Sequence, residues 1–294
     1  MIKTGLSAKV PDFVGLVRYL KSHPDVEIVW ITNAGRQAVV SYLYPELTGE
    51  YDGKFAEEGD FDAIDLYIGP WTPEIDSHPE VKAIVYGAAD GAAAEIESGL
   101  AELNRKALVR GARVAAVPAL TEIIGSLALM PLARNLMLTT PISGAMLLPE
   151  TDARYAETAL GLLGDEQLGP LRRALTALQT SFAAPMRITG FTTNDGVAMA
   201  TLTVDCRMPV ADVARLYHDF YDDHRHVVIL EDPVHDVCAP MVRGTYKAVV
   251  SLRSDGTALT VTAAVDSSQR TGAGSALHLL NLLFGLHELT GFRS

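Results

Sequence analysis

Short apolar runs alternate with amphipathic stretches along the first half of the chain. Apolar runs at Ile2–Leu6 and Glu27–Thr32 flank Asp12–Lys21, where large apolar residues recur at helical spacing. His23–Pro24 is expected to end that helix, because proline supplies no amide hydrogen and restricts the residue before it. The later runs predict three strands and then a helix, at Ala63–Ile68, Val81–Val85, Val114–Val117 and Ile123–Ala133. This alternation predicts an α/β domain with a doubly wound, Rossmann-like parallel sheet.

The second half has a different pattern, in which apolar and polar residues alternate singly. Val197–Cys206 alternates in this way, and two similar runs, Tyr246–Arg253 and Ala258–Val265, flank the turn-forming residues Ser254–Thr257. Helices are expected at Pro209–Tyr221 and Gly274–Gly285. The pattern predicts an α+β domain with a mainly antiparallel sheet after the Rossmann-like domain.

Composition narrows the class of protein. A chain of 294 residues with 48% hydrophobic content can build two domains with a sizeable core. The net charge of −12 argues against nucleic-acid binding, which requires clustered basic residues. No apolar run approaches the ~20 residues of a membrane helix, and Met1–Gly5 lacks the apolar region of a signal peptide. Cys206 and Cys238 form no disulfide framework, so a cytoplasmic protein is expected.

Two linked segments carry the most specific signal. Gly99–Arg105 reads Gly-Leu-Ala-Glu-Leu-Asn-Arg and is followed by Ala116–Leu120, which reads Ala-Val-Pro-Ala-Leu. The pair resembles N-acetyl-gamma-glutamyl-phosphate reductases of the semialdehyde dehydrogenase superfamily. In that family a Gly-Leu-Pro-Glu-Leu-Asn-Arg segment precedes an Ala-Asn-Pro-Gly-Cys loop, whose cysteine attacks the acyl phosphate. Pro131–Leu136 also fits the family spacing without a gap, so the resemblance puts Leu120 at the cysteine position.

The resemblance is strongest near the C-terminus. Asn281–Leu286 and Glu288–Gly291 are near copies of the family's ending. Polar positions that the family places near the nicotinamide have changed and read Ser267, Arg270, Thr271 and Ser275 here. The resemblance implies a Rossmann-like NADP-binding-type domain at 1–118, with its last helix from about 270–294, and an α+β dimerisation and catalytic-type domain at 119–269.

The nucleotide-binding loop of the family is altered in this chain. Ala8 and Pro11 stand where the first two glycines of a Gly-x-x-Gly-x-x-Gly turn belong, and Asp12 brings a negative charge to the helix start. Asp12 fits an ordinary helix N-cap, the alternative being a surviving nucleotide site. Arg36 either faces solvent or contacts a 2′-phosphate. The resemblance implies NADP as the cofactor, and the altered loop makes its binding doubtful. The candidate contacts with NADP are Ser7, Arg36, Ser267 and Gly274.

The family's other active-site motifs are also replaced. Its His-x-His-x-Pro-Glu motif falls on Asp165–Pro170, which puts Gln167 near the histidine position. A Ser-Gly-rich loop is shortened to about Ser143–Ala145, the Pro-Arg-Gly arginine becomes part of Asn194–Gly196, and the Asp-Phe-Arg element reads Ala89–Gly91. A reductase of this kind needs a thiolate nucleophile and a histidine to manage its proton. We therefore expect no catalytic residue here.

Several other residues invite a functional interpretation. His224–His226 beside Asp222–Asp223 suggests metal ligands, but a solvated loop is the expectation. Cys206 is expected to be a buried small hydrophobe, and Cys238 a loop residue rather than a reactive thiol. Trp71 either packs in the core or at its rim, or fills the space that the cofactor takes in the family.

Three functions follow from these observations. The leading hypothesis is a catalytically inactive family member that acts as partner or regulator, as a homo-oligomer or as a hetero-oligomer with an active reductase subunit. The first alternative is a working NADP-dependent reductase of arginine biosynthesis, the family activity. The second is a non-catalytic module that binds a metabolite in an altered cleft.

Overall fold

The chain folds into two compact units. The computed structural model describes residues 1–87, 92–150, 161–230 and 236–292. Met1–Pro118 and Thr271–Ser294 make up the first unit, and Ala119–Arg270 make up the second. The C-terminal helix therefore returns to the unit in which the chain began.

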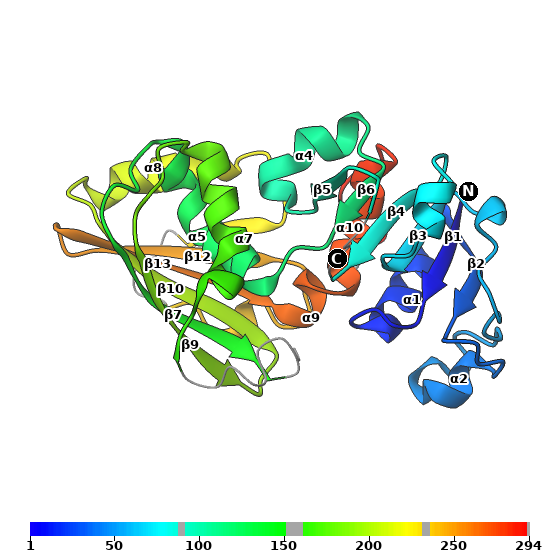
Figure 1. Cartoon of the computed structure of the whole chain (residues 1–294). Coiled ribbons are helices and arrows are strands. Elements are labelled where there is room, and N and C mark those ends of the chain that lie inside the picture. The colour runs from blue at the N-terminus through cyan, green and yellow to red at the C-terminus, as the bar shows by residue number, and fades with distance from the viewer. Residues whose placement is uncertain (88–91, 151–160, 231–235, 293–294) are drawn as a thin grey trace. The chain divides into compact units, whose positions relative to one another are not determined.

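The first unit is a six-stranded parallel sheet with helices (Figure 1). Its strand order is β2-β1-β3-β4-β6-β5, so the chain passes from β1 to β2 on one side and then crosses back to β3 on the other side of β1. The strands are β1 Ile2–Ser7, β2 Val26–Thr32, β3 Leu66–Pro70, β4 Lys82–Tyr86, β5 Ile96–Ser98 and β6 Val114–Ala116. The α-helices are α1 Phe13–Ser22, α2 Val40–Leu43, α3 Glu74–Ser77, α4 Ala101–Arg110 and α10 Ala273–Leu283, and the 3₁₀ turns are Pro45–Leu47 and Phe61–Ala63.

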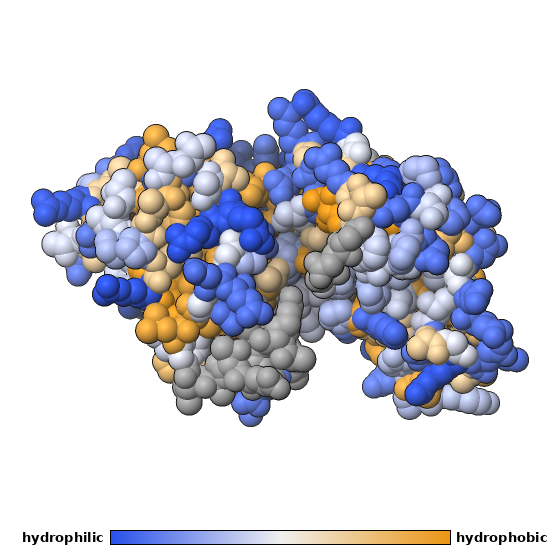
Figure 2. All heavy atoms as spheres, viewed as in Figure 1, coloured by the Kyte–Doolittle hydropathy of each residue, from blue (hydrophilic) through white to orange (hydrophobic). Residues whose placement is uncertain are grey.

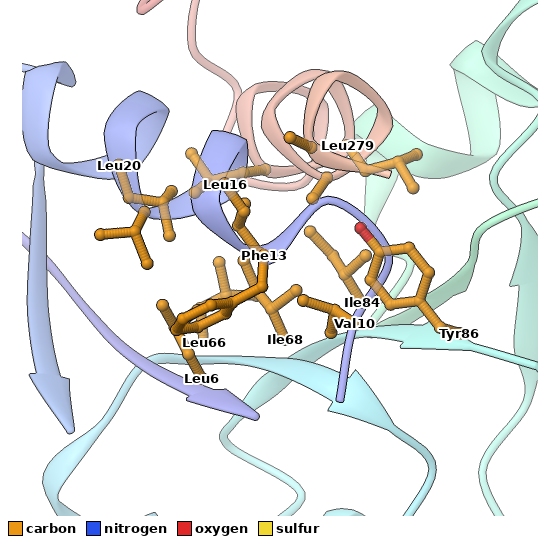
Figure 3. Packing of buried hydrophobic residues seen from close by; sticks show 14 of the residues in the cluster. Leu6, Val10, Phe13, Leu16, Leu20, Leu66, Ile68, Ile84, Tyr86 and Leu279 are labelled. Carbon is orange, nitrogen blue, oxygen red and sulfur yellow. The ribbon is translucent and has the colours of Figure 1, made fainter. Parts of the chain in front are cut away.

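The core of this unit lies between the sheet and the pair of helices α1 and α10. Leu16 and Leu20 project from α1, and Leu279 projects from α10, over apolar strand residues (Figure 3). The strand residues beneath them are Leu6, Leu66, Ile68 and Ile84. Parallel strands buried on both faces are apolar throughout, which is why short apolar runs identified β1, β2, β3, β4 and β6 in the sequence. The edge strand β5, which reads Ile-Glu-Ser and is only half-buried, was not predicted.

The second unit has a seven-stranded mixed sheet in the order β11-β12-β13-β10-β7-β9-β8. The strands are β7 Ile142–Pro149, β8 Gly161–Leu162, β9 Met186–Thr193, β10 Val197–Asp205, β11 Val227–Leu230, β12 Ala248–Ser254 and β13 Ala258–Asp266. The helices are α5 Leu120–Arg134, α7 Asp165–Leu178, α8 Val210–Tyr221 and α9 Ser267–Arg270, with a 3₁₀ turn at Ala239–Met241. The predicted β12–β13 hairpin is confirmed. The sheet is mainly antiparallel, but the β7–β9 and β11–β12 pairs are parallel.

Helix α5 is the centre of the second unit and is buried around almost its whole circumference. Pro131 lies inside it and has no amide hydrogen to give to the carbonyl of Leu127 four residues earlier. The Tyr221 hydroxyl from α8 donates to that oxygen at 2.8 Å, and Tyr217 donates to the carbonyl of Ala128. Tyr221 thus satisfies the carbonyl that the proline leaves without a donor, and Tyr217 adds a second contact between α8 and α5. No helix in the described parts of the chain is long and apolar enough to cross a membrane.

We expect Tyr221→Phe to destabilise the second unit by about 1–3 kcal/mol, because it leaves a buried carbonyl without a donor. Hydrogen exchange of α5 peptides, followed by mass spectrometry, measures the change. Tyr42→Phe is the matched control, since Tyr42 is 78% exposed and should leave exchange in α5 unchanged. Equal protection of α5 in both variants would contradict this account of the proline.

On one face of the sheet of the second unit, which we call the open face, no helix packs within the part of the chain that the structure describes. Along β10, Ala198, Ala200 and Leu202 are buried, whereas the alternate residues Met199, Thr201 and Thr203 are only half-buried. The registers align these alternate residues in rows across the sheet, including Met199 with Leu147 and Phe191, and Thr201 with Thr262, Ala145 and Thr189. The segment 237–242 packs on part of this face, at Val249 and Ala264. Orange surface is visible in Figure 2 in the area that Figure 1 labels β7 and β9.

Candidate functional site

Leu120 is the first residue of α5 and follows the loop that leaves β6. Its side chain is completely buried. A cysteine at the start of a helix would have its thiolate stabilised by the helix dipole, which makes such a position suitable for a nucleophile. A leucine there contributes only apolar packing.

Gln167 occupies the first turn of α7. Its side-chain oxygen accepts from the amide of Gly164 at 3.0 Å, and its backbone carbonyl accepts from the Thr121 hydroxyl at 2.7 Å. Because Thr121 directly follows Leu120, the structure brings together the two positions that the resemblance assigns to nucleophile and base. A glutamine amide holds the helix start and transfers no proton at neutral pH.

Asp12 closes the start of α1, as the sequence predicts. Its carboxylate accepts from the amide of Gly15 at 3.2 Å, and a Cβ on Gly15 would lie 2.3 Å from that carboxylate. The backbone of Asp12 is left-handed, with φ 50° and ψ 47°. A helix start is attractive to a phosphate because its amides are free, but Asp12 uses one of them and adds negative charge, while Pro11 offers none.

Ser7 and Trp71 lie at the carboxyl ends of β1 and β3, where the strand order reverses and open α/β sheets bind ligands. Ser7 is buried, and its hydroxyl accepts from the amide of Lys9 at 3.2 Å. Trp71 packs against the aromatic cluster of Trp30, Phe61 and Tyr67, in agreement with the core or rim interpretation.

Tyr67 belongs to the same cluster and donates to the carbonyl of Pro70 at 3.1 Å. Burial raises the pKa of Tyr67 to about 12, so its hydroxyl stays protonated and remains a donor at neutral pH.

Arg36 stands in an exposed turn closed by its own amide, which donates to the carbonyl of Asn33 at 3.0 Å. No hydrogen bond or ion pair of its side chain is present among the residues that the structure describes, which is the solvent-facing arrangement. Because the guanidinium of Arg36 is available, its contact with the 2′-phosphate of NADP stays a prediction.

The two candidates near the C-terminus belong to different units. Ser267 opens α9 in the second unit, where its amide and its hydroxyl both donate to the carbonyl of Gly196, at 3.0 and 2.7 Å. Gly274 is buried in α10 of the first unit. Arg270, at the family's lysine position, is buried with its guanidinium 4.2 Å from the centre of the Tyr246 ring. The side chains of Ser267 and Arg270 therefore make contacts within the second unit.

Two expectations from the sequence need correction. The loop expected at Ser143–Ala145 is part of β7, where a Cβ on Gly144 would lie only 2.1 Å from the carbonyl oxygen of Thr201. The backbone of the neighbouring strand leaves room only for glycine there. The solvated loop expected at His224–His226 is wrong for His226, which is buried with its ring 4.7 Å from that of Tyr246.

The other residues that the sequence singled out lie in a connection between strands, in buried or exposed positions, or outside the described residues. Asn194–Gly196 connects β9 to β10, with Gly196 at φ 76°. Cys206 is buried, as predicted, and Cys238 is exposed. Ala89–Gly91 lies outside the described residues. No group of three potential metal-ligating side chains occurs in the described ranges.

Sequence reasoning missed a buried polar network in the first unit. Glu288 forms an ion pair with Arg105 and lies 3.1 Å from Nε2 of His278, and these contacts lower the pKa of Glu288 to about 2, the hydrogen bond with His278 contributing most. The Asn281 side chain joins His23 at 3.0 Å to the carbonyl of Thr290 at 2.8 Å. The available signal was the helical spacing of His278 and Asn281 within an otherwise apolar helix.

Comparison with known proteins finds relatives that carry the same name, at low sequence identity. No family model matches the chain. It is 28% identical over 320 residues to a protein of Parabacteroides distasonis named N-acetyl-gamma-glutamyl-phosphate reductase, covering 99% of this chain and 98% of the relative. A protein of Bacteroides thetaiotaomicron with the same name is 28% identical over 323 residues, covering 100% and 98%.

Solved structures share the fold. Aspartate semialdehyde dehydrogenase II from Vibrio cholerae superposes with a TM-score of 0.70 at 11% identity, over 97% of this chain and 99% of that one. Aspartate semialdehyde dehydrogenase with NADP from Candida albicans gives 0.69 at 12% identity, over 97% and 98%. The resemblance drawn from the sequence is confirmed: the chain is a divergent, full-length homologue of the N-acetyl-gamma-glutamyl-phosphate reductases and has the semialdehyde dehydrogenase fold.

Proposed function

We propose that this homologue is catalytically silent and acts as a partner or regulator of an active reductase subunit. The observation that carries the proposal is the pair Leu120 and Gln167. The hydrogen bond of 2.7 Å from Thr121 to the carbonyl of Gln167 puts the two positions side by side, at the starts of α5 and α7. One position holds an alkyl group and the other an amide.

The reduction of an acyl phosphate through a thioester needs a thiolate to attack the acyl carbon and a base to handle the thiol proton. Leu120 has no lone pair, and Gln167 has no titratable group near neutral pH. The Thr121 hydroxyl is buried and donates its proton to the Gln167 carbonyl, which cannot act as a general base. The described side chains at this place support binding and packing rather than covalent chemistry.

The cofactor side of the proposal is that NADP binds weakly at best. A relative in fold was solved with NADP, and this chain has that fold. Its phosphate loop, however, combines a proline without an amide hydrogen with the carboxylate of Asp12, which bonds to the amide of Gly15. An anion approaching the start of α1 therefore meets a negative charge where the fold usually offers free amides.

The open face of the second unit supports a role in assembly. Leu147 and Phe191 are neighbours in the register of β7 and β9, and they are 38% and 39% exposed. The neighbouring row is uncharged, with threonine hydroxyls that bond in cross-strand pairs such as Thr201 with Thr262 at 3.3 Å. These two rows form an uncharged patch, and Arg187 and Arg253 follow in the next row of the same face. An apolar and hydroxyl-bearing patch with a charged border is suited to packing against the same face of a homologous subunit.

Co-expression with an active reductase tests the partner role, and native mass spectrometry measures it. We expect mixed oligomers that contain both chains, and we expect Phe191→Asp to abolish them, because it places a charge at the centre of an apolar contact. Tyr42→Asp is the control, since it adds the same charge at an exposed residue of the first unit. Only separate homo-oligomers, or equal assembly by both variants, would contradict the proposal.

A further inference from the structure

A cavity of about 460 Å³ opens in the first unit, next to α4, β5 and β6. Glu95 directly precedes β5, Arg113 directly precedes β6, and Arg110 ends α4, so the cavity lies at the amino ends of these strands. In a parallel sheet this is the opposite edge from the carboxyl ends, where Ser7 and Trp71 stand. The cavity is therefore separate from the nucleotide loop, and its volume suits a small metabolite.

Three charged side chains line this cavity without partners. Glu95, Glu97 and Arg110 make no hydrogen bond or ion pair in the portion of the chain that the structure describes. Opposite charges that share a cavity usually pair with one another when their geometry allows it. Because these do not, both carboxylates and one guanidinium are available to a ligand.

The fourth charged residue gives the cavity a fixed wall. Nη1 of Arg113 donates to the carbonyl of Ile75 at 2.8 Å, with longer contacts to the carbonyls of His78 and Val81. Its Nη2 lies 3.9 Å from Asp76. Arg113 is thus held in place and largely neutralised by its own partners, and Arg110 is the free positive group.

The backbone around the cavity adds two further features. The last carbonyls of a helix carry partial negative charge, and α4 ends at Arg110 on the cavity wall. Strand β5 is at the edge of the sheet, where among the described strands it pairs with β6 alone, from Ile96 with Val114 to Ser98 with Ala116. The Ser98 carbonyl, at the far end of β5 from the cavity, accepts from the Asn104 side chain at 3.0 Å.

We propose that this cavity is a binding site for a free α-amino acid with a cationic side chain. Two free carboxylates and the end of α4 match the two positive groups of such a ligand, and Arg110 matches its carboxylate. A dicarboxylic amino acid would place a second anion against Glu95 and Glu97, and a neutral one would leave a carboxylate without a partner. The site requires no reaction, so the proposal is independent of whether the chain is an active reductase.

Titration of the full-length chain with L-lysine, followed by isothermal calorimetry, tests the proposal, with 1,5-diaminopentane as a probe that has both cationic groups but no carboxylate. We expect saturable binding of both probes. Glu97→Gln should weaken the binding of both probes at least about tenfold, because both lose a charged hydrogen bond from an ammonium group. Arg110→Gln should weaken the binding of L-lysine by the same factor, because the ligand carboxylate loses its partner, and should leave the binding of 1,5-diaminopentane unweakened.

Glu58→Gln and Arg225→Gln are the matched controls, since they remove the same charges from exposed positions elsewhere and should leave both affinities unchanged. The proposal fails if the wild type shows no saturable binding of L-lysine up to about 10 mM. It also fails if Glu97→Gln and Arg110→Gln bind as the wild type does, or if L-glutamate binds as tightly as L-lysine.

Discussion

Purified protein is expected to convert N-acetylglutamate semialdehyde, with phosphate and NADP, about 10⁶ times more slowly than an active homologue. Removing the nucleophile from a well-studied covalent enzyme costs roughly this factor, and the base is missing here as well. Losses of residues that act as a unit do not add, so the absence of the base beside Leu120 does not multiply the deficit further. The measurement is the appearance of NADPH absorbance at high protein concentration.

The relative from Parabacteroides distasonis, assayed in parallel, supplies the positive control. A rate that follows this protein through purification and disappears in Thr121→Val would contradict the proposed silence. Thr121 carries the hydroxyl nearest to position 120 in sequence, and it already bonds to the carbonyl of Gln167 at 2.7 Å. Such a result would mean that a different nucleophile has been recruited, and the alternative of a working reductase would replace the silent one.

A fluorescence titration with NADPH separates binding from chemistry. We expect no saturation below about millimolar NADPH in the wild type, because Asp12 repels the phosphates and uses the amide of Gly15. Asp12→Asn keeps a capping group but removes the charge, so it should bind NADPH more tightly than the wild type. Micromolar binding of NADPH by the wild type would contradict the proposal that NADP binds weakly. It would not affect the expectation that the protein turns over substrate about 10⁶ times more slowly than an active homologue.

The fold was largely predictable from the sequence, because its signals are local. Apolar runs identified the buried parallel strands, and Ser254–Thr257 identified the β12–β13 hairpin. The run at Ala63–Ile68 predicted a longer strand than the structure contains. Asp60 accepts from the amide of Asp62 and starts a 3₁₀ turn, so β3 begins only at Leu66. Side-chain caps of this kind compete with strand pairing and are difficult to weigh from sequence alone.

The candidate site was predictable only in part, because side-chain partners come from residues distant in sequence. The spacing of motifs led to both Leu120 and Gln167, and the structure places them at neighbouring helix starts. Nothing in the local pattern showed that Gly144 faces the backbone of β10 or that His226 packs on Tyr246. Both depend on the register of strands that are far apart along the chain.

The polar network of α10 is expected to have the largest effect on stability. Glu288 is 8% exposed and bonds to both His278 and Arg105, so Glu288→Gln removes the charge that both partners face. We expect the free energy of unfolding to fall by about 2 kcal/mol at neutral pH. This is less than the full pKa shift of Glu288 would give, because solvent reaches the Arg105 side chain and screens the ion pair. Trp30 and Trp71 both lie in the first unit, so tryptophan fluorescence in a denaturant titration reports the unfolding of that unit alone.

The same carboxylate gives this effect a defined pH dependence. The pKa of Glu288 falls from an ordinary value of 4.5 to about 2 in the folded protein, so the unfolded chain binds the proton more tightly. The stabilisation is therefore complete above the unfolded pKa and is lost as the pH falls from about 5 toward 2. The difference between wild type and Glu288→Gln should shrink over that range. A difference that stays constant down to pH 3 would mean that the glutamine disturbs packing around His278 rather than removing a charge, because a packing defect does not titrate with this carboxylate.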